Sequence, residues 1–276
     1  MRVRREKGKG RAWDLRNIGW RVGVDATAAA SAGVLVAPII TVIDRAIIEN
    51  ASGKRSLGDS MRSSLRTLLF KPHNFFFSKP FALIFTLYTS TYLTANTIDT
   101  LSSTANSTPY TTTTHGTPKF AATSLANLSL CLWKDTHFTR LFSPVAARPL
   151  PLPTYALFTL RDSLTIFASF NLPPLLGPKL PMQLLPAFMQ NWRRESVAQF
   201  LAPAAVQVFS TPLHLLGLDF YNRSSGGGLG WRDRWVVVRR AWVVSCFARL
   251  GRIVPAFGVG GVVNGNVRRG LMGRLE

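Results

Sequence analysis

Four charged side chains lie inside segments that are otherwise apolar, and their chemistry points to a polar path. Arg161 and Asp162 are neighbours seven residues into one apolar run. Arg249 and Arg252 are three positions apart in another, which places them on one helical face. Ionisable groups at membrane depth are costly, and they normally face a bundle interior or a water-filled cavity. We therefore expect them to mark a substrate path. The alternative is that these segments do not enter a membrane and that water solvates the charges.

A further charged cluster, Lys134, Asp135 and Arg140, lies near the end of a third apolar run. At that position a long side chain can extend to the interface between lipid and water. The sequence alone therefore does not require these residues to line a cavity.

The composition is basic but poor in charge. The 276 residues include 33 Lys and Arg against 13 Asp and Glu, a net charge of +20, yet only 17% are charged and 47% are hydrophobic. Average soluble domains carry roughly 25% charged residues. This balance excludes a disordered polyelectrolyte and is unlike a typical histone or ribosomal protein. The basic residues lie beside apolar runs without an aromatic and basic recognition motif, so we expect no nucleic acid as a partner.

Residue patterns that carry catalysis or bind metals are sparse. Cys131 and Cys246 both lie in apolar runs, and the four histidines show no spacing typical of metal ligands. The sequence contains no phosphate-binding loop, nucleophile elbow or paired-carboxylate motif. It therefore predicts a protein that is not an enzyme and that holds no cofactor or metal.

Six apolar segments predict the fold class. A bilayer core of about 30 Å requires roughly 20 helical residues. The first, second and fifth segments meet this length without interruption, and the others meet it only if their charges are tolerated. We expect an all-α membrane protein with six transmembrane helices. The segments are 26–43, 80–98, 120–142, 154–172, 196–218 and 241–267.

The connections between these segments differ in charge. Residues 49–72 hold five Lys and Arg with two acids, and residues 221–240 hold five with one acid, whereas residues 99–119 are rich in Ser and Thr. Basic connections favour the non-translocated side of a membrane, so the odd-numbered connections are expected to share one side. Residues 1–23 hold eight Lys and Arg with two acids. This is typical either of a targeting segment or of a surface tail that binds anionic lipid head groups.

Charged and polar positions recur along the chain at intervals that predict three helix pairs. Asp44, Asp135 and His214 align near the ends of the odd segments, with spacings of 91 and 79 residues. A repeating unit of this size is typical of internally duplicated folds. The predicted repeats are about 24–110, 118–180 and 190–270 within a membrane domain 24–270, followed by a tail at 271–276.

The sixth segment resembles a motif of the mitochondrial carrier family. Residues 248–259 read A-R-L-G-R-I-V-P-A-F-G-V, which is similar to that family's A-R-x-x-R-x-x-P-x-x-G-V. The family's P-x-D-x-x-K-x-R is matched in the third segment by Asp135 and Arg140, with Trp133 in place of proline. The resemblance implies a multi-pass protein of the mitochondrial inner membrane, with three pseudo-repeated helix pairs around a central cavity, that transports a solute.

The resemblance also implies roles for individual residues. The family's substrate contacts correspond here to Phe77, Arg161, Asp162 and Arg252, and Arg249 lies on the same helical face as Arg252. Two arginines in a cavity favour a carboxylate, and Asp162 can receive an amino group. The implied substrate is a small anionic or zwitterionic solute, such as a carboxylate or an amino acid. The alternative is that Arg161 and Asp162 only pair with neighbours to hold the bundle together.

The family closes its matrix side with a ring of salt bridges, and this sequence departs from that ring. The residues that match the gate are Asp44, Asp135, Arg140 and His214. The positions of the partner bases are uncharged and hold Ile47, Phe138 and Gly217. Two functions therefore stay open, a solute carrier and a non-transporting inner-membrane scaffold or assembly factor. In both, the lipid bilayer, including anionic lipids, is the expected partner.

Overall fold

The computed structural model describes residues 13–114, 117–146, 148–170, 172–191, 194–223, 230–252 and 254–276. Within these ranges every regular element is helical, so the predicted all-α class is confirmed. Residues 1–12 of the predicted basic leader lie outside the described residues. The elements are α1 (Ile18–Ala51), α2 (Leu57–Phe70), α3 (Pro72–Phe76), α4 (Lys79–Asn106), α5 (Thr117–Phe142), α6 (Leu152–Phe170), α7 (Leu172–Leu176), η1 (Gly177–Lys179), η2 (Met182–Leu184), α8 (Ala187–Gln190), α9 (Arg194–Asn222), α10 (Trp231–Leu250), η3 (Val254–Gly260) and α11 (Gly261–Met272).

Each of the first five apolar segments falls on one long helix: α1, α4, α5, α6 and α9. The sixth does not, because the chain breaks after α10, passes through the wide turn of η3 and continues as α11. Pro255 lies in this break and cannot donate a backbone hydrogen bond to the preceding turn. The prediction of one continuous helix over 241–267 is therefore wrong.

In the part of the chain that the structure describes, two helical stretches are long and apolar enough to cross a bilayer, Ile18–Ala51 and Leu201–Asn222. The first is the whole of α1, and the second is the greater part of α9. Together with the helical fold they are consistent with a membrane protein. That all six segments span the membrane remains a prediction.

Small residues allow α1 and α4 to pack closely along their length. Ala28, Ala29 and Ala32 are fully buried on α1. Gly33 continues this face, and a Cβ there would approach the ring of Phe85 on α4 at 3.3 Å. Small side chains at such an interface let two helix backbones come close together.

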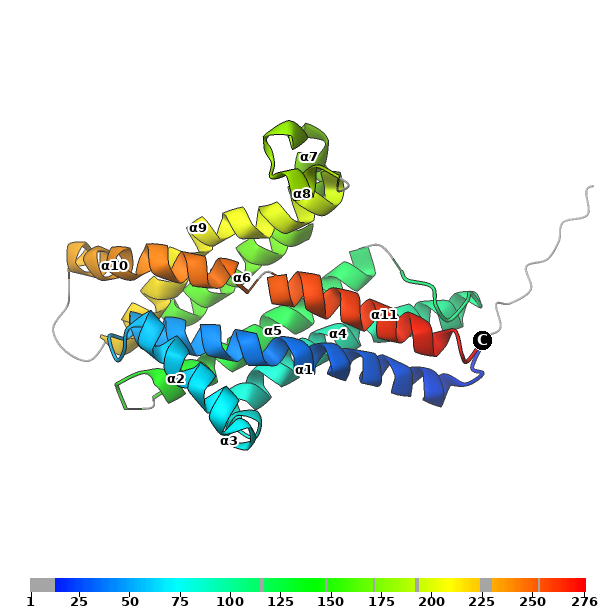
Figure 1. Ribbon diagram of the computed structural model, residues 1–276, viewed down its shortest axis with the longest axis horizontal. Helices are drawn as coiled ribbons and strands as arrows, with labels where there is room; N and C mark the ends of the chain where they lie inside the picture. The colour runs from blue at the N-terminus through cyan, green and yellow to red at the C-terminus, as the bar shows by residue number, and fades with distance from the viewer. Residues whose placement is uncertain are drawn as a thin grey trace, which may run out of the picture.

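The helices form two neighbouring groups. Figure 1 shows α1 beside α4, with α10 and α11 following one another on the same side of the bundle, while α6 and α9 rise away and carry α7 and α8 at their far end. The end of α1, the connection between α5 and α6 and the start of α10 lie at one end of the bundle. The described ends of the two basic connections, 49–72 and 221–240, therefore lie at the same end of the bundle as the connection between α5 and α6.

The long helices follow one another in the predicted order, but α6 packs mainly against α9 and not against α5, so they do not form three equivalent pairs. In the first pair, α2 and α3 lie between the two long helices, whereas residues 143–146 and 148–151 of the second connection contain no helix. The three-repeat organisation is therefore not confirmed.

Both ends of the predicted membrane domain differ from the sequence-based boundaries. α1 begins at Ile18, inside the predicted leader, and Arg21 is fully buried. Arg21 donates hydrogen bonds to the Thr100 carbonyl at 3.1 Å and the Ser103 hydroxyl at 2.5 Å. The predicted tail packs against the bundle, since the Glu276 carboxylate accepts a hydrogen bond of 3.0 Å from the backbone of Thr111.

Candidate functional site

A cavity of about 380 Å³ lies between the two groups of helices. Its wall is built from α4, α5, α6, α9, α10 and the break that follows α10. Its volume falls in the range typical of sites for small molecules. The charged residues on its wall are Lys119, Lys134, Arg161, Asp162, Arg249 and Arg252.

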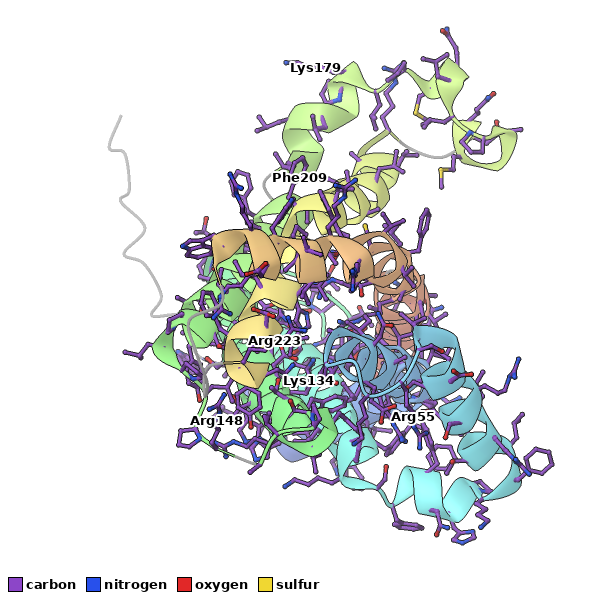
Figure 2. The ribbon with its side chains drawn as sticks, turned by 90° about the vertical axis from the view of Figure 1, so that its left-hand side faces the viewer. Arg55, Lys134, Arg148, Lys179, Phe209 and Arg223 are labelled. Atoms are coloured by element: carbon purple, nitrogen blue, oxygen red, sulfur yellow. The ribbon has the colours of Figure 1, made fainter. Side chains whose placement is uncertain are left out.

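The Asp44 carboxylate on α1 forms ion pairs with two cations of the cavity wall. Its Oδ2 contacts Lys134 Nζ at 2.8 Å, and its Oδ1 contacts Arg252 Nη1 at 2.8 Å. Lys134 is 3% exposed, and Figure 2 places it in the middle of the bundle. The break after α10 positions Arg252 for this contact. One carboxylate thereby joins α1, α5 and the end of α10.

Arg161 of α6 forms the centre of the charged cluster. It contacts Asp135 Oδ2 at 2.5 Å, and its guanidinium forms a two-pronged contact with Asp162 at 2.8 Å and 2.5 Å. Asp135 is also paired with Lys134. Such bidentate pairs fix the orientation of an arginine strongly. Arg161 and Asp162 pair with each other and also line the cavity. Pairing within the bundle and facing a substrate path, the two alternatives from the sequence, are therefore compatible.

Arg249 differs from the other cations because its partners are neutral. Its Nη1 lies 2.7 Å from His214 Nδ1, and its Nε donates to the Gln207 side-chain oxygen at 2.8 Å. It is 5% exposed and lines the cavity. Among the described residues no carboxylate forms an ion pair with it. A buried charge without a counter-charge is costly, so Arg249 is the group that gains most from an anion in the cavity.

The cluster as a whole carries an excess of positive charge. Three carboxylates, Asp44, Asp135 and Asp162, each contact a lysine or an arginine. The cations are Lys134, Arg161, Arg249 and Arg252. With His214 neutral, four cations against three carboxylates leave one positive charge in excess. The arrangement is therefore suited to hold a ligand that presents a carboxylate to Arg249.

Most predicted site residues are brought together. The cavity is lined by Arg161, Asp162, Arg249 and Arg252, and their contact with a substrate stays a prediction. The predicted gate residues at the ends of odd segments also meet this cluster, in contacts with the cavity wall. They are Asp44, Asp135 and His214. The uncharged residues Ile47, Phe138 and Gly217 do not prevent these contacts, because the partner cations come from other positions.

Two predicted residues lie elsewhere. Phe77 is 91% exposed, because it lies in the turn before α4 begins and not on a helix facing the cavity. Arg140 is exposed at the last turn of α5, where its Nε donates to the Arg148 carbonyl at 3.2 Å. It is five residues beyond Asp135, and this spacing turns it to a different side of the helix. The structure therefore does not bring Phe77 or Arg140 to the cavity.

Sequence reasoning missed two members of the site. Lys134 was expected to reach the interface, but it is buried and paired with Asp44. Gln207 was passed over, although a glutamine in the apolar run LAPAAVQVFS is itself a signal of a buried polar contact. In the described part of the chain, no three metal-ligating side chains come together.

A second polar network lies at the other end of α1. Asp25 accepts from Arg268 of α11 at 2.8 Å and from the Thr100 hydroxyl of α4 at 2.6 Å. Asn96 and Asn264 exchange two hydrogen bonds of 2.9 Å beside it. These contacts tie α1, α4 and α11 together and leave α6 and α9 outside the network.

Comparison with known proteins identifies the family. A family model described as a probable citrulline exporter matches residues 28–272, while a search of curated proteins finds none that matches. The match contradicts the prediction of a diverged mitochondrial carrier. The motif that carried that resemblance is short, and its two arginines and proline are explained locally by the cavity and the helix break. The exporter family and the long apolar helices indicate a membrane protein that transports a solute. Since the match covers most of the chain, the protein belongs to the family of probable citrulline exporters.

Proposed function

We propose that this protein exports citrulline across a membrane through the cavity described above, without a covalent step. The family description supports the substrate, and one observation carries the proposal. Arg249 is buried on the cavity wall, and its hydrogen-bond partners among the described residues, Gln207 and His214, are both neutral. A zwitterionic amino acid supplies the carboxylate that Arg249 lacks.

The cavity offers groups for each part of citrulline. Its α-carboxylate pairs with Arg249, and its α-ammonium pairs with Asp162, which faces the cavity from α6. The side chain of citrulline ends in a ureido group, which both donates and accepts hydrogen bonds. Asn127 lies on the cavity wall two turns of α5 before Lys134, about 10 Å along the helix axis, and its amide suits that group.

The excess positive charge also argues for selectivity. Arginine and ornithine share the amino-acid head group, but their side chains add a cation. Placing a further cation in a cluster that already holds an excess cation is unfavourable. Citrulline is neutral at its side chain, so we expect the cavity to prefer it over its cationic relatives.

A reconstituted export assay tests the proposal. The purified chain in liposomes loaded with labelled citrulline is expected to release it, and Arg249→Gln to reduce the initial rate by more than tenfold. Arg240→Gln is the matched control, because Arg240 is exposed on the same helix. Unlabelled ornithine outside the vesicles is expected to compete weakly. If wild type and Arg249→Gln release citrulline no faster than empty liposomes, the non-transporting scaffold is favoured instead.

We propose the mitochondrial inner membrane as the location. The support is the Arg-rich, acid-poor composition of residues 1–23, which is typical of a mitochondrial targeting segment. Import of the full chain into isolated mitochondria should depend on the membrane potential. Replacing Arg2, Arg4 and Arg5 by glutamine should abolish that import. Unchanged import would favour the surface-tail interpretation.

Anionic lipids are the partner that we propose for α2. Its exposed side presents apolar Leu69 and Phe70 together with Arg62 and Arg66. A helix of this kind lies in the membrane interface, where basic residues attract anionic head groups. Anionic phospholipid should raise the thermal stability of the detergent-solubilised protein more than zwitterionic lipid does. The double variant Arg62→Gln, Arg66→Gln should lose that difference.

A further inference from the structure

His214 is held in an unusual position between two cations. Its Nδ1 lies 3.0 Å from Arg161 Nη1 and 2.7 Å from Arg249 Nη1. A guanidinium can only donate hydrogen bonds, so Nδ1 is the acceptor of both. The ring is therefore neutral, with its proton on Nε2. That Nε2 is buried and has no hydrogen-bond partner among the described residues.

The neighbours of this ring come from several helices. On α6 the charged groups are Arg161 and Asp162, and on α5 they are Lys134 and Asp135. Arg249 faces the ring from α10, and Phe158 packs against it with ring centroids 5.1 Å apart. The remaining charged residues of the cluster, Asp44 and Arg252, pair with each other beyond Lys134. A proton on Nδ1 is unfavourable while both arginines point at that atom.

We propose that His214 binds a proton that is transported together with the substrate. When the carboxylate of the substrate binds Arg249, that guanidinium leaves Nδ1 and its charge is neutralised. The lone pair of Nδ1 then accepts a proton from a hydronium ion in the water of the cavity. One N–H bond forms, one O–H bond of the hydronium ion breaks, and neutral water is left. The new N–H cannot face a guanidinium donor, so it favours the position of Arg249 on the carboxylate and leaves Arg161 to Asp135 and Asp162.

The coupling follows from the shared arginine and is reciprocal. A bound carboxylate favours the protonated ring, so a protonated ring must favour the bound carboxylate by the same factor. Release of the substrate returns Arg249 to Nδ1 and expels the proton. This inference depends on the proposed export of an amino acid by the same site, and it adds a proton as the second transported species.

Proton movement and citrulline movement can be measured in the same liposomes. With a pH-sensitive dye inside and the membrane potential clamped, outward citrulline flux through the full chain should acidify the outside and alkalise the lumen. A gradient of one pH unit should support an equilibrium citrulline ratio of about tenfold, if one proton accompanies each molecule. His214→Gln retains a neutral acceptor for the two arginines and should lose the proton movement that accompanies each citrulline. His137→Gln, on the outside of α5, is the matched control.

The outcomes separate the two proposals. Citrulline flux in the wild type without any proton movement would overturn the coupling and leave the export function standing. Proton movement that survives fully in His214→Gln would also overturn the assignment to His214. No citrulline flux in the wild type would overturn the export function and the coupling together. The wild-type measurement decides the coupling even if the His214→Gln protein does not fold.

Discussion

Arg268 donates a hydrogen bond of 2.8 Å to Asp25, and this ion pair joins the last helix to the first across 243 positions of sequence. Both side chains are nearly fully buried. Along α1, Asp25 lies about 28 Å from Asp44, which is close to the thickness of a bilayer core. The polar network around Asp25 and the charged cluster around Asp44 are therefore separated by about the thickness of a bilayer core.

Removing the cation of the ion pair between Asp25 and Arg268 should lower the stability of the protein. Arg268→Met leaves the Asp25 carboxylate buried and short of its cation, which typically costs about 3–5 kcal/mol. Arg269→Met is the control, because the adjacent Arg269 is exposed. Thermal unfolding in detergent should show a clear loss for the first variant and little change for the second. Equal effects would mean that the pair does not hold the two helices together.

The contact of Asp44 with Arg252 should appear as an energetic coupling in transport. Asp44→Asn leaves Arg252 without its carboxylate, and Arg252→Gln leaves Asp44 with Lys134 as its remaining cation, so each should slow citrulline flux on its own. The double variant removes both charges and should lose less than the two effects added together, with a coupling of about 0.5–3 kcal/mol. Strict additivity of the two changes would show that this ion pair does not operate in the functional protein.

The absence of a side chain at Gly217 leaves room for the ring of Phe158, which packs against His214. A Cβ at this position would lie 2.7 Å from Cε1 of Phe158, and Phe158 packs against His214. Gly217→Ala should therefore destabilise the protein by about 1–3 kcal/mol, and Phe158→Leu in the same chain should restore part of that loss. Gly265→Ala in α11 meets no atom within 4 Å and should be neutral or slightly stabilising. Chemical or thermal unfolding of the three variants measures these differences.

Cys131 reports on the cavity directly. It lines the cavity wall on α5, while Cys246 is buried on α10. In a Cys246→Ala background, a small methanethiosulfonate reagent should label Cys131, and saturating citrulline should slow the reaction several-fold by occupying the space. Cys131→Ala in the same background should remove the labelling. A labelling rate that citrulline leaves unchanged would place the substrate elsewhere.

The sequence alone determined the helical class and the segments in which the charged residues lie. Apolar runs of about 20 residues predict helices, and the charges within them are visible without a structure. A charge inside an apolar run normally faces a bundle interior or a water-filled cavity. This rule was enough to name Arg161, Asp162, Arg249 and Arg252. The family could not be read reliably from one short motif, since its two arginines serve needs that unrelated bundles share.

The tertiary structure decided which residues meet. A helix turns by about 100° per residue, so a few positions separate a residue in the cluster, such as Asp135, from an exposed one, such as Arg140. The break at Pro255 and the packing of α1 against α10 bring Arg252 to Asp44. The packing of α10 against α9 leaves Arg249 with His214 and Gln207 as its neutral partners. Pairing of this kind depends on helix rotation and crossing, which are set by contacts between segments far apart in the chain.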